Sequence, residues 1–300
     1  MVIMTDFSYS DIHIRYGTRD DLQDIMDISK NALEDDYILS YINEWFIEKG
    51  IMIAEINDKP VGFQKVEPLW DNSLWLSAAR VLKEWRRSGI GSALLSKAIE
   101  RATIDGLKVV RMAVFDYNTP SINLVRKFKF TIEARYVEVS FKNNGYSETG
   151  DDMDIYNDRP DRRPSIHAGI DNVTSNNLLT LENVNESLYV KMGNNLINYN
   201  WCFFVPDIRF IEQVNKKKAL HGIKSRFLSF QMGKDAGIFP LAGNIELIME
   251  EINDNTMVYD AEDIFLIIPE RYIDIRKNLP IFMKKLKSER LSVYSHVLNK

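Results

Sequence analysis

The sequence predicts a mixed α/β fold for the first part of the chain and a second α/β part after it. The hydrophobic residues repeat in the order strand, two helices, three strands, helix, strand, helix, strand, and this series ends near Phe141. A stretch rich in Asn, Asp, Gly and Pro then runs from Lys142 to Asn177 without a sustained period. A chain of 300 residues also exceeds one average domain. We therefore expect two domains, the first built around a mixed sheet.

The first elements combine one strand with two helices. "IHIRYG", residues 12–17, alternates apolar and polar residues and predicts a strand. Thr18 is a suitable N-cap for the helix "TRDDLQDIMDIS", whose first turn is acidic and whose apolar residues then form a stripe. A second helix is predicted over residues 37–49.

Strands and helices alternate through the rest of this part. Two apolar runs flank Asn-Asp-Lys-Pro at residues 57–60, which predicts a hairpin. After the hairpin we expect a strand at 73–82, a helix at 91–103, a strand at 108–115, a helix at 121–130 and a strand at 132–141.

Composition also sets the predicted domain boundaries. We expect a first domain over residues 1–145, a polar linker over 146–177 and a C-terminal α/β domain over 178–300. This last domain is either unrelated to the first or a decayed second copy of it. Its residues indicate no particular function. Its predicted strands and helices are strands at 187–193, 200–205 and 262–270, and helices at 207–220 and 244–253.

The overall composition excludes several classes of function. A net charge of -5 gives no reason to bind nucleic acid or an anionic membrane, and no apolar run is long enough to span a bilayer. The N-terminus lacks the pattern of a secretory signal, and Cys202 is the only cysteine, so we expect a cytoplasmic protein without disulfides. No two of the four histidines share a metal-ligand spacing, so we expect no metal site.

The segment "EWRRSGIGSALLSKAIERA", residues 84–102, carries the clearest chemistry. It places two arginines and two glycines between a predicted strand and the start of a helix, where unpaired backbone N–H groups attract an anion. Gly89 and Gly91 let the backbone approach a ligand, and Arg86 and Arg87 offer charge-assisted bonds to phosphate oxygens. The alternative is a tight glycine turn with solvated arginines.

Here the sequence resembles the GCN5-related N-acetyltransferases, which bind acetyl-coenzyme A. Their Gln/Arg-x-x-Gly-x-Gly/Ala motif is matched by residues 86–91, Arg-Arg-Ser-Gly-Ile-Gly. A second motif of the family is matched by Asn118, Ser121, Leu124 and Phe130. The predicted order of elements from about residue 11 to 141 also fits that family.

The resemblance implies a role for each matched residue. The backbone of Val81, Leu82 and Lys83 would run beside the pantetheine arm, on a fourth strand splayed from its neighbour. A backbone N–H at Ala79 or Val81 would stabilise the thioester oxygen as negative charge develops. Asn118 and Ser121 would contact the cofactor, or serve only as turn and helix-start residues. The pyrophosphate would be held by the side chains of Arg86 and Arg87 and by the N–H groups of Ser88, Gly89, Ile90, Gly91 and Ser92.

The sequence departs from the family where proton transfer is concerned. Many relatives carry a tyrosine that protonates the leaving thiolate at the position of Val125, and their usual glycine near the helix end is Lys129 here. Tyr117 and Tyr136 are nearby in sequence and are either substitutes or packing residues. Without a general acid catalysis is weakened, by typically about 10²–10⁴-fold, but not forbidden.

The general base is equally open, because residues 74–82 contain no carboxylate. Glu67 and Asp71 precede that strand and either relay a proton through water or are simply solvated. Arg80 is unusual in an apolar strand and either faces substrate or pairs with a carboxylate. The acidic run Glu34-Asp35-Asp36 either attracts a cationic amine or is a solvated helix end.

These observations predict an enzyme that transfers an acetyl group from acetyl-CoA to an amine by direct attack. The acceptor is a peptide or protein amine or a small amine, and a homodimer is left open. The alternative is a non-catalytic acetyl-CoA-binding sensor or interaction module. A second copy in the C-terminal part would lack the Arg-x-x-Gly-x-Gly motif and could not seat the cofactor in the same way.

Overall fold

The computed structural model describes residues 9–33, 36–40, 42–47, 50–142, 178–222, 225–232, 235–253, 261–275 and 287–298. The chain forms two compact units. Unit 1 comprises Met1–Arg135, Cys202–Phe204 and Leu291–Lys300, and unit 2 comprises Tyr136–Trp201 and Val205–Arg290. These ranges differ from the predicted 1–145 and 178–300, because two short segments from the second half of the chain belong to unit 1. The whole of the predicted linker, 146–177, lies outside the described residues.

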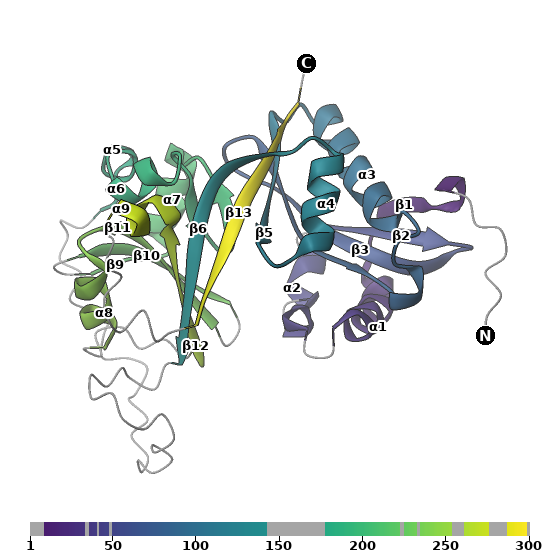
Figure 1. The fold of residues 1–300 in the computed structure, drawn as a ribbon, viewed down its shortest axis with the longest axis horizontal. Coiled ribbons are helices and arrows are strands. Elements are labelled where there is room, and N and C mark those ends of the chain that lie inside the picture. The colour runs from purple at the N-terminus through teal and green to yellow at the C-terminus, as the bar shows by residue number, and fades with distance from the viewer. Residues whose placement is uncertain are drawn as a thin grey trace, which may run out of the picture. The chain divides into compact units, whose positions relative to one another are not determined.

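Unit 1 is a twisted sheet with helices on both faces (Figure 1). Helices α1 (Leu22–Ala32) and α2 (Ile42–Ile47) cover one face, and α3 (Ile90–Ile104) and α4 (Thr119–Lys127) cover the other. Strands β4 and β5 run parallel, and the other neighbours are antiparallel. In spatial order the strands are β1 (His13–Tyr16), β2 (Ile51–Ile56), β3 (Lys59–Pro68), β4 (Ser73–Val81), β5 (Val109–Phe115) and β13 (Lys287–Val297).

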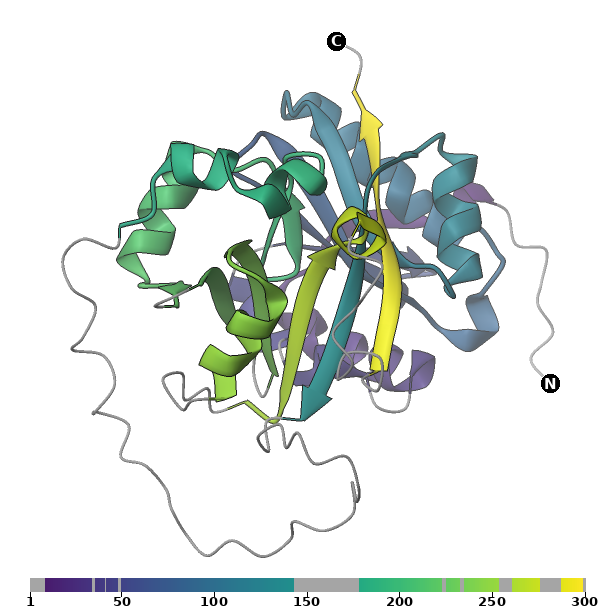
Figure 2. The same cartoon turned by 60° about the vertical axis from the view of Figure 1, so that its left-hand side comes forward.

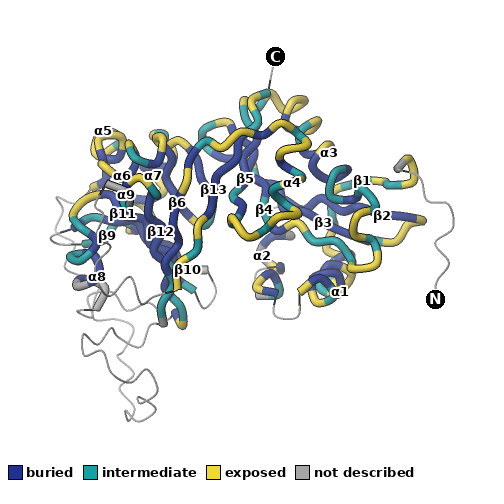
Figure 3. Tube along the Cα trace, viewed as in Figure 1, coloured by how far each residue is buried: buried dark blue, intermediate teal, exposed yellow. Residues whose placement is uncertain are grey.

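Local sequence explains these elements well. The predicted hairpin is confirmed: Asn57 and Asp58 adopt φ values of 50° and 60°, the left-handed pair that joins two antiparallel strands tightly. Helix α3 buries Leu94, Leu95 and Ala98 against the sheet, while its outer face is exposed (Figure 3). The helical spacing of these residues therefore fixes which side of α3 faces the core.

Unit 2 also has a sheet with helices packed on it. Strand β6 (Thr131–Lys142) belongs to it from Tyr136 onward and runs antiparallel to β12 (Asp263–Pro269), beside which it lies in Figure 2. The remaining strands, in order from β12, are β11 (Asp235–Ala242), β10 (Arg226–Met232) and β9 (Leu220–His221). The helices are α5 (Leu181–Asn185), α6 (Leu188–Met192), α7 (Ile208–Lys216), α8 (Ile245–Asn253) and α9 (Glu270–Ile275).

The two units repeat one topology. In unit 1 the antiparallel series β2, β3, β4 is followed by α3, by β5 parallel to β4, and by α4. In unit 2 the antiparallel series β9, β10, β11 is followed by α8, by β12 parallel to β11, and by α9. The C-terminal part is therefore the second copy that the sequence left as one of two alternatives.

Each unit takes its last strand from the other half of the chain. Strand β6 follows α4 in sequence, but its residues 136–142 pair with β12 in unit 2. Strand β13 follows α9, but its residues 291–297 pair with β5 in unit 1. The two copies have exchanged the strand that comes after their final helix.

One predicted element of the C-terminal part is wrong. Residues 187–193 were expected as a strand and form helix α6 instead. The Ser187 side chain accepts a hydrogen bond from the Val190 N–H at 3.1 Å, the usual helix N-cap arrangement. Across the described residues, no helix combines the length and apolar character needed to cross a membrane.

A half-buried arginine joins the elements at the edge of unit 1. Arg15 on β1 donates two bonds to the Asp21 carboxylate at 2.6 and 2.8 Å and two to Glu55 Oε1 on β2 at 2.6 and 2.8 Å. These bonds hold the pKa of both carboxyl groups below their ordinary values, despite the opposing effect of burial. Arg15 thus joins β1, β2 and the start of α1.

We expect Arg15→Met to lower the free energy of unfolding by about 1.5–3 kcal/mol near neutral pH, because it removes hydrogen bonds to two charged groups. Both carboxyl pKa values are depressed in the folded state, so this contribution is complete above the ordinary carboxyl pKa of about 4 and is lost as the pH falls further. Urea unfolding at a series of pH values from about 7 to about 3 should show the difference from the parent shrinking. Arg101→Met, which removes an exposed pair with Asp105, should cost less than about 1 kcal/mol. A difference from the parent that is independent of pH would contradict this account.

Candidate functional site

The central feature of unit 1 is the parting of two parallel strands. Strands β4 and β5 pair only from Ser73 to Trp75, opposite residues 109–111. Beyond Trp75, β4 continues to Val81 with no partner on its β5 side among the described residues. We call the opening between residues 76–81 of β4 and 112–115 of β5 the splay.

Strand β4 also carries a bulge beside the splay. Lys65 of β3 is opposite Ser77, but Phe63 is opposite Arg80, so Ala78 and Ala79 together face Gln64. Ala78 has a φ of 53°, as an extra residue in a bulge requires. The bulge turns the free edge of β4 and gives it two small side chains.

Register shows which backbone groups face the splay. The Leu82 N–H donates to the Val61 carbonyl at 3.0 Å, so this pair exchanges bonds between β3 and β4. Because bonded and non-bonded pairs alternate, the next pair, Val81 with Gly62, is non-bonded. The N–H and carbonyl of Val81 therefore point away from β3 and toward the splay, where Arg86 Nε donates to the carbonyl at 3.4 Å.

The start of α3 supplies a second set of free donors. Gly89 is the N-cap residue with a φ of 93°, a conformation that favours glycine. The first bond of the helix runs from the Ala93 N–H to the Gly89 carbonyl at 2.9 Å. The N–H groups of Ile90, Gly91 and Ser92 therefore have no partner within the helix, and the helix dipole makes this end attractive to an anion.

Gly91 is not required by the protein's own packing. A Cβ built at this position would meet only Leu124 Cδ2, at an ordinary contact distance of 3.7 Å. A glycine inside a helix costs about 0.5–1 kcal/mol relative to alanine. A ligand that needs close approach to the backbone explains this glycine better than the fold does.

The two arginines of the motif differ in their surroundings. Arg86 donates to the Ala32 carbonyl at 3.0 Å and to the Val81 carbonyl at 3.4 Å, so it ties the loop to α1 and to the end of β4. Arg87 is exposed and makes no hydrogen bond or ion pair in the described part of the chain. The predicted phosphate contact of Arg86 is thus replaced in this structure by bonds to backbone, and Arg87 is the arginine available to an anion.

Two further predicted cofactor contacts are engaged within the protein. The Lys83 N–H donates to Asn31 Oδ1 at 2.8 Å, so this amide is directed at α1 and not into the splay. The Asn118 side chain accepts a bond from the Ser121 N–H at 3.2 Å and caps α4. The sequence had left this structural role open for Asn118 and Ser121, and it had given no sign of Asn31.

The structure separates the two tyrosines proposed as general acids. Tyr117 follows β5 at the end of the splay, is 67% exposed and stacks on Phe115 with a centroid distance of 5.4 Å. Tyr136 is fully buried in unit 2, where its hydroxyl lies 3.1 and 3.2 Å from the carbonyls of Gly193 and Leu196. These contacts favour the second alternative for Tyr136, that of a packing residue.

The two candidate carboxylate bases are also distinguished. Glu67 accepts a bond from Lys65 Nζ at 3.0 Å and lies 3.7 Å from the Cys202 sulfur, and 28% of its side chain is exposed. Asp71 is bonded to Arg111 at 2.6 Å and to Ser73, and its side chain is only 8% exposed. Asp71 therefore stabilises the core through its pair with Arg111. Of these two carboxylates, Glu67 is the one with a side chain accessible to solvent.

Arg80 and Asp36 form a buried pair that the sequence described only as alternatives. Arg80 donates to both Asp36 oxygens at 2.7 and 2.8 Å, and Ser29 adds a third bond at 2.5 Å. Burial lowers the pKa of Arg80, but Asp36 and Tyr37 together outweigh this effect and keep the pKa above its ordinary value. Asp36 is thus neither a solvated helix end nor free to attract an amine, and Glu34 and Asp35 lie outside the described residues.

A short strand from the second half of the chain covers the face of the splay opposite α3. Strand β8 (Cys202–Phe204) belongs to unit 1 and contacts both β4 and β5. Phe203 packs on Trp75 with ring centroids 5.7 Å apart, and Cys202 reaches Glu67.

Unit 2 contains a corresponding parting, but it is filled. Strands β11 and β12 pair only from Asp235 to Ile238, and helix α6 packs against both strands. Tyr189 of α6 is fully buried and donates to the Gly243 carbonyl at 3.2 Å, at the junction before α8. Asn244 caps α8 through a bond from the Leu247 N–H at 2.7 Å. The second copy has therefore occupied its own opening.

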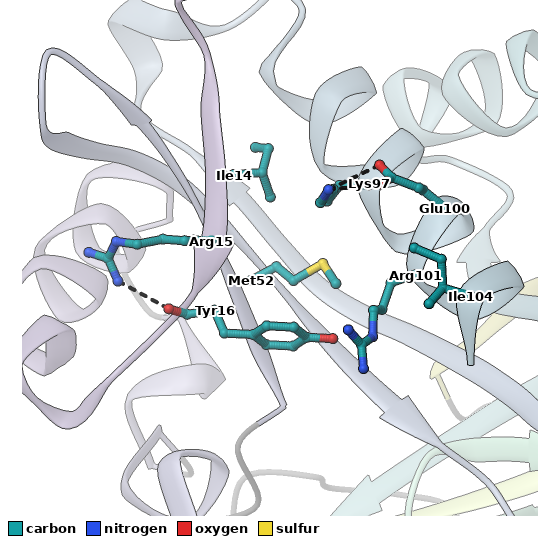
Figure 4. A pocket seen from close by; sticks show the side chains of 8 residues that line it. All are labelled: Ile14, Arg15, Tyr16, Met52, Lys97, Glu100, Arg101 and Ile104. Carbon is teal, nitrogen blue, oxygen red and sulfur yellow. Dashed lines mark hydrogen bonds and ion pairs between the residues drawn. The ribbon is translucent and has the colours of Figure 1, made fainter.

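A separate cavity of about 240 Å³ lies between β1, β2 and the C-terminal half of α3 (Figure 4). It is lined by Ile14, Arg15, Tyr16, Met52, Lys97, Glu100, Arg101 and Ile104. None of the predicted site residues is among them, and the Lys97 and Arg101 cations at its rim are each paired with a carboxylate of the same helix. This cavity is not the site that the sequence predicts.

Comparison with known proteins agrees with this geometry. Residues 19–130 match the Acetyltransferase (GNAT) family model. An uncharacterized N-acetyltransferase of Methanocaldococcus jannaschii is 29% identical over 134 residues, which is 39% of this chain and 59% of that protein. Streptothricin acetyltransferase A of Bacillus subtilis is 28% identical over 105 residues, 35% of this chain and 60% of that protein. The chain thus spans about three fifths of the length of these curated relatives.

A solved structure extends the likeness to almost the whole chain. A candidate acetyltransferase from Thermoplasma acidophilum superimposes with a TM-score of 0.63 at 16% identity, covering 95% of this chain and all of that one. At this identity the likeness shows the fold alone, and it includes both halves.

We expect Asp36→Leu to lower the free energy of unfolding by about 3–5 kcal/mol, because it leaves the buried Arg80 guanidinium without its partner. The double variant Asp36→Leu with Arg80→Met should recover most of that loss, since no buried charge remains. Urea unfolding of the parent, the two single variants and the double variant checks this. If the Asp36→Leu variant and the double variant lost the same free energy of unfolding, the unpaired Arg80 charge would not be the cause of the loss.

Proposed function

We propose that this chain, whose residues 19–130 match the GNAT acetyltransferase family model, is an N-acetyltransferase that moves an acetyl group from acetyl-CoA to an amine. The observation that carries the proposal is the alignment of two sets of free backbone donors, at the start of α3 and along the splay. The single cysteine is a buried free thiol, in keeping with a cytoplasmic enzyme.

The cofactor spans both sets of donors in this proposal. The diphosphate is held by the N–H groups of Ile90, Gly91 and Ser92, with Arg87 adding charge. The pantetheine arm enters the splay and lies along Val81, in place of the β5 partner that β4 lacks. The thioester then reaches the bulge, where the N–H of Ala79 or Val81 donates a hydrogen bond to the developing oxyanion.

The chemistry is direct attack in a ternary complex. The neutral acceptor amine adds to the thioester carbonyl carbon, the carbonyl oxygen becomes an oxyanion, and the C–S bond then breaks to release CoA. Glu67 takes the amine proton through water, and Tyr117 gives a proton to the thiolate. Holding both reactants in one opening supplies much of the rate advantage.

The acceptor is an amine small enough or extended enough to enter the splay beside β8, which contacts both β4 and β5. The name of the Bacillus relative speaks for a small molecule, and a peptide N-terminus has the same extended shape. The second candidate function, an acetyl-CoA sensor, is favoured by Val125: it is fully buried and has no proton to donate. Free thiol released from acetyl-CoA only when an amine is added separates the enzyme from the sensor.

Gly91→Val should weaken acetyl-CoA binding by about 10-fold or more while leaving the protein folded, because the branched side chain occupies the space above the helix start. Ser96→Val, an equally branched change on the exposed side of α3, should leave binding as in the parent. Isothermal titration with acetyl-CoA checks both and should give one site per chain, since α6 fills the opening of unit 2. If Gly91→Val bound acetyl-CoA as tightly as the parent, the diphosphate would not be bound at this helix start.

Tyr117→Phe should slow amine-dependent thiol release by about 10²-fold or more without changing acetyl-CoA affinity, because only the proton donor is lost. The measurement is colorimetric thiol release at saturating acetyl-CoA with a panel of small amines and peptides. Tyr37→Phe, which changes a tyrosine that is 49% exposed and lies beside Arg80, is the control. An unchanged rate in Tyr117→Phe would show that the Tyr117 hydroxyl does not protonate the leaving thiolate.

A further inference from the structure

One buried polar side chain on the α3 face of unit 1 has no role in the fold described so far. Gln64 on β3 is 4% exposed, and its Oε1 has no hydrogen-bond partner in the described part of the chain. Across β2 its neighbour is Met52, and along β3 the next residue on the same face is Val66; both belong to the apolar core under α3. An unpaired carbonyl oxygen in such surroundings carries the full cost of its desolvation.

The register puts Gln64 next to the splay. On its other side it faces the bulge, where Ala78 and Ala79 stand opposite this one residue. Neither alanine has a side chain beyond Cβ, so the space above β4 is not filled by a large neighbour at this point. Adjacent strands lie about 4.8 Å apart, a distance that an extended glutamine side chain bridges. The amide of Gln64 can therefore approach a group that lies along the far edge of β4.

The face of Gln64 is fixed by its neighbours. A Cβ at Gly62, two residues earlier on β3, would lie 3.0 Å from Ile90 Cγ2 at the start of α3. Side chains two residues apart on a strand point to the same face. Gln64 thus lies on the α3 side of the sheet, between the helix start that offers the anion site and the bulge that offers the oxyanion donors.

We propose that Gln64 is a positioning residue for the acyl end of the coenzyme, with its Oε1 accepting a hydrogen bond from the pantetheine amide N–H nearest the thioester. This inference rests on the proposed function, because it needs the pantetheine arm in the splay. The contact places the thioester carbon beside the bulge, and it pairs the oxygen that the free protein leaves unpaired. Gln64 binds no reacting atom and acts through the orientation of the arm.

The test compares acetyl-CoA with ADP, which carries a diphosphate but no pantetheine arm. Isothermal titration should show Gln64→Met binding acetyl-CoA about 3- to 10-fold more weakly than the parent, the range for loss of one hydrogen bond, with ADP affinity unchanged. The melting temperature of Gln64→Met should equal or exceed that of the parent, since a buried unpaired oxygen is gone. Met52→Leu, a conservative change on the neighbouring strand, should leave the ratio of the two affinities as in the parent.

Several outcomes would overturn the inference. Parent-like acetyl-CoA binding by Gln64→Met would do so, and so would equal weakening of acetyl-CoA and ADP, which is the mark of a merely structural role. Should Gln64→Met not fold, Gln64→Asn keeps the amide but withdraws it by one methylene, and the same selective weakening is expected. A parent that binds neither ligand would instead refute the proposed function, and the two failures are thereby distinguished.

Discussion

Strand β4 has β5 beside it for only three residues and then runs on toward α3 with one edge bare. Backbone N–H and carbonyl groups on a bare edge need partners, so a strand in this position is stable only if something else holds it. Here the Arg80–Asp36 pair anchors it to the segment before α2, and Arg86 joins the carbonyl of Val81 to that of Ala32. Charged side chains thus replace a neighbouring strand as the support of the free edge. The bulge, the glycine cap of α3 and the covering strand β8 are all arranged around the opening that remains.

Much of unit 1 could be predicted because its signals are local. The hairpin at residues 57–60, the apolar stripe of α3 and the glycine-rich turn before it each depend on residues close together in sequence. The predicted helix start at residue 91 lies one residue from the observed start at Ile90, which Gly89 caps in a left-handed conformation. Elements predicted from such local signals begin and end within a few residues of their positions in the structure.

The parts that could not be predicted depend on distant partners. Asp36 and Arg80 are 44 residues apart, and Asn31 reaches the Lys83 amide across 52, so neither contact has a sequence signature. The assignment of Arg86 to phosphate was reasonable for an arginine beside a helix start, but two backbone carbonyls compete for it. Helix α6 was mistaken for a strand because "SLYVKM" is short and apolar, and only the cap formed by Ser187 decides its form.

The exchange of β6 and β13 between the two halves has a consequence for the persistence of each half. After such an exchange neither copy is a self-sufficient module, because each would leave one edge of its sheet open if the other were deleted. A substitution that breaks the sheet of one unit is therefore expected to remove support from the other unit as well. For the same reason, neither half of the chain is expected to persist if the other half is lost.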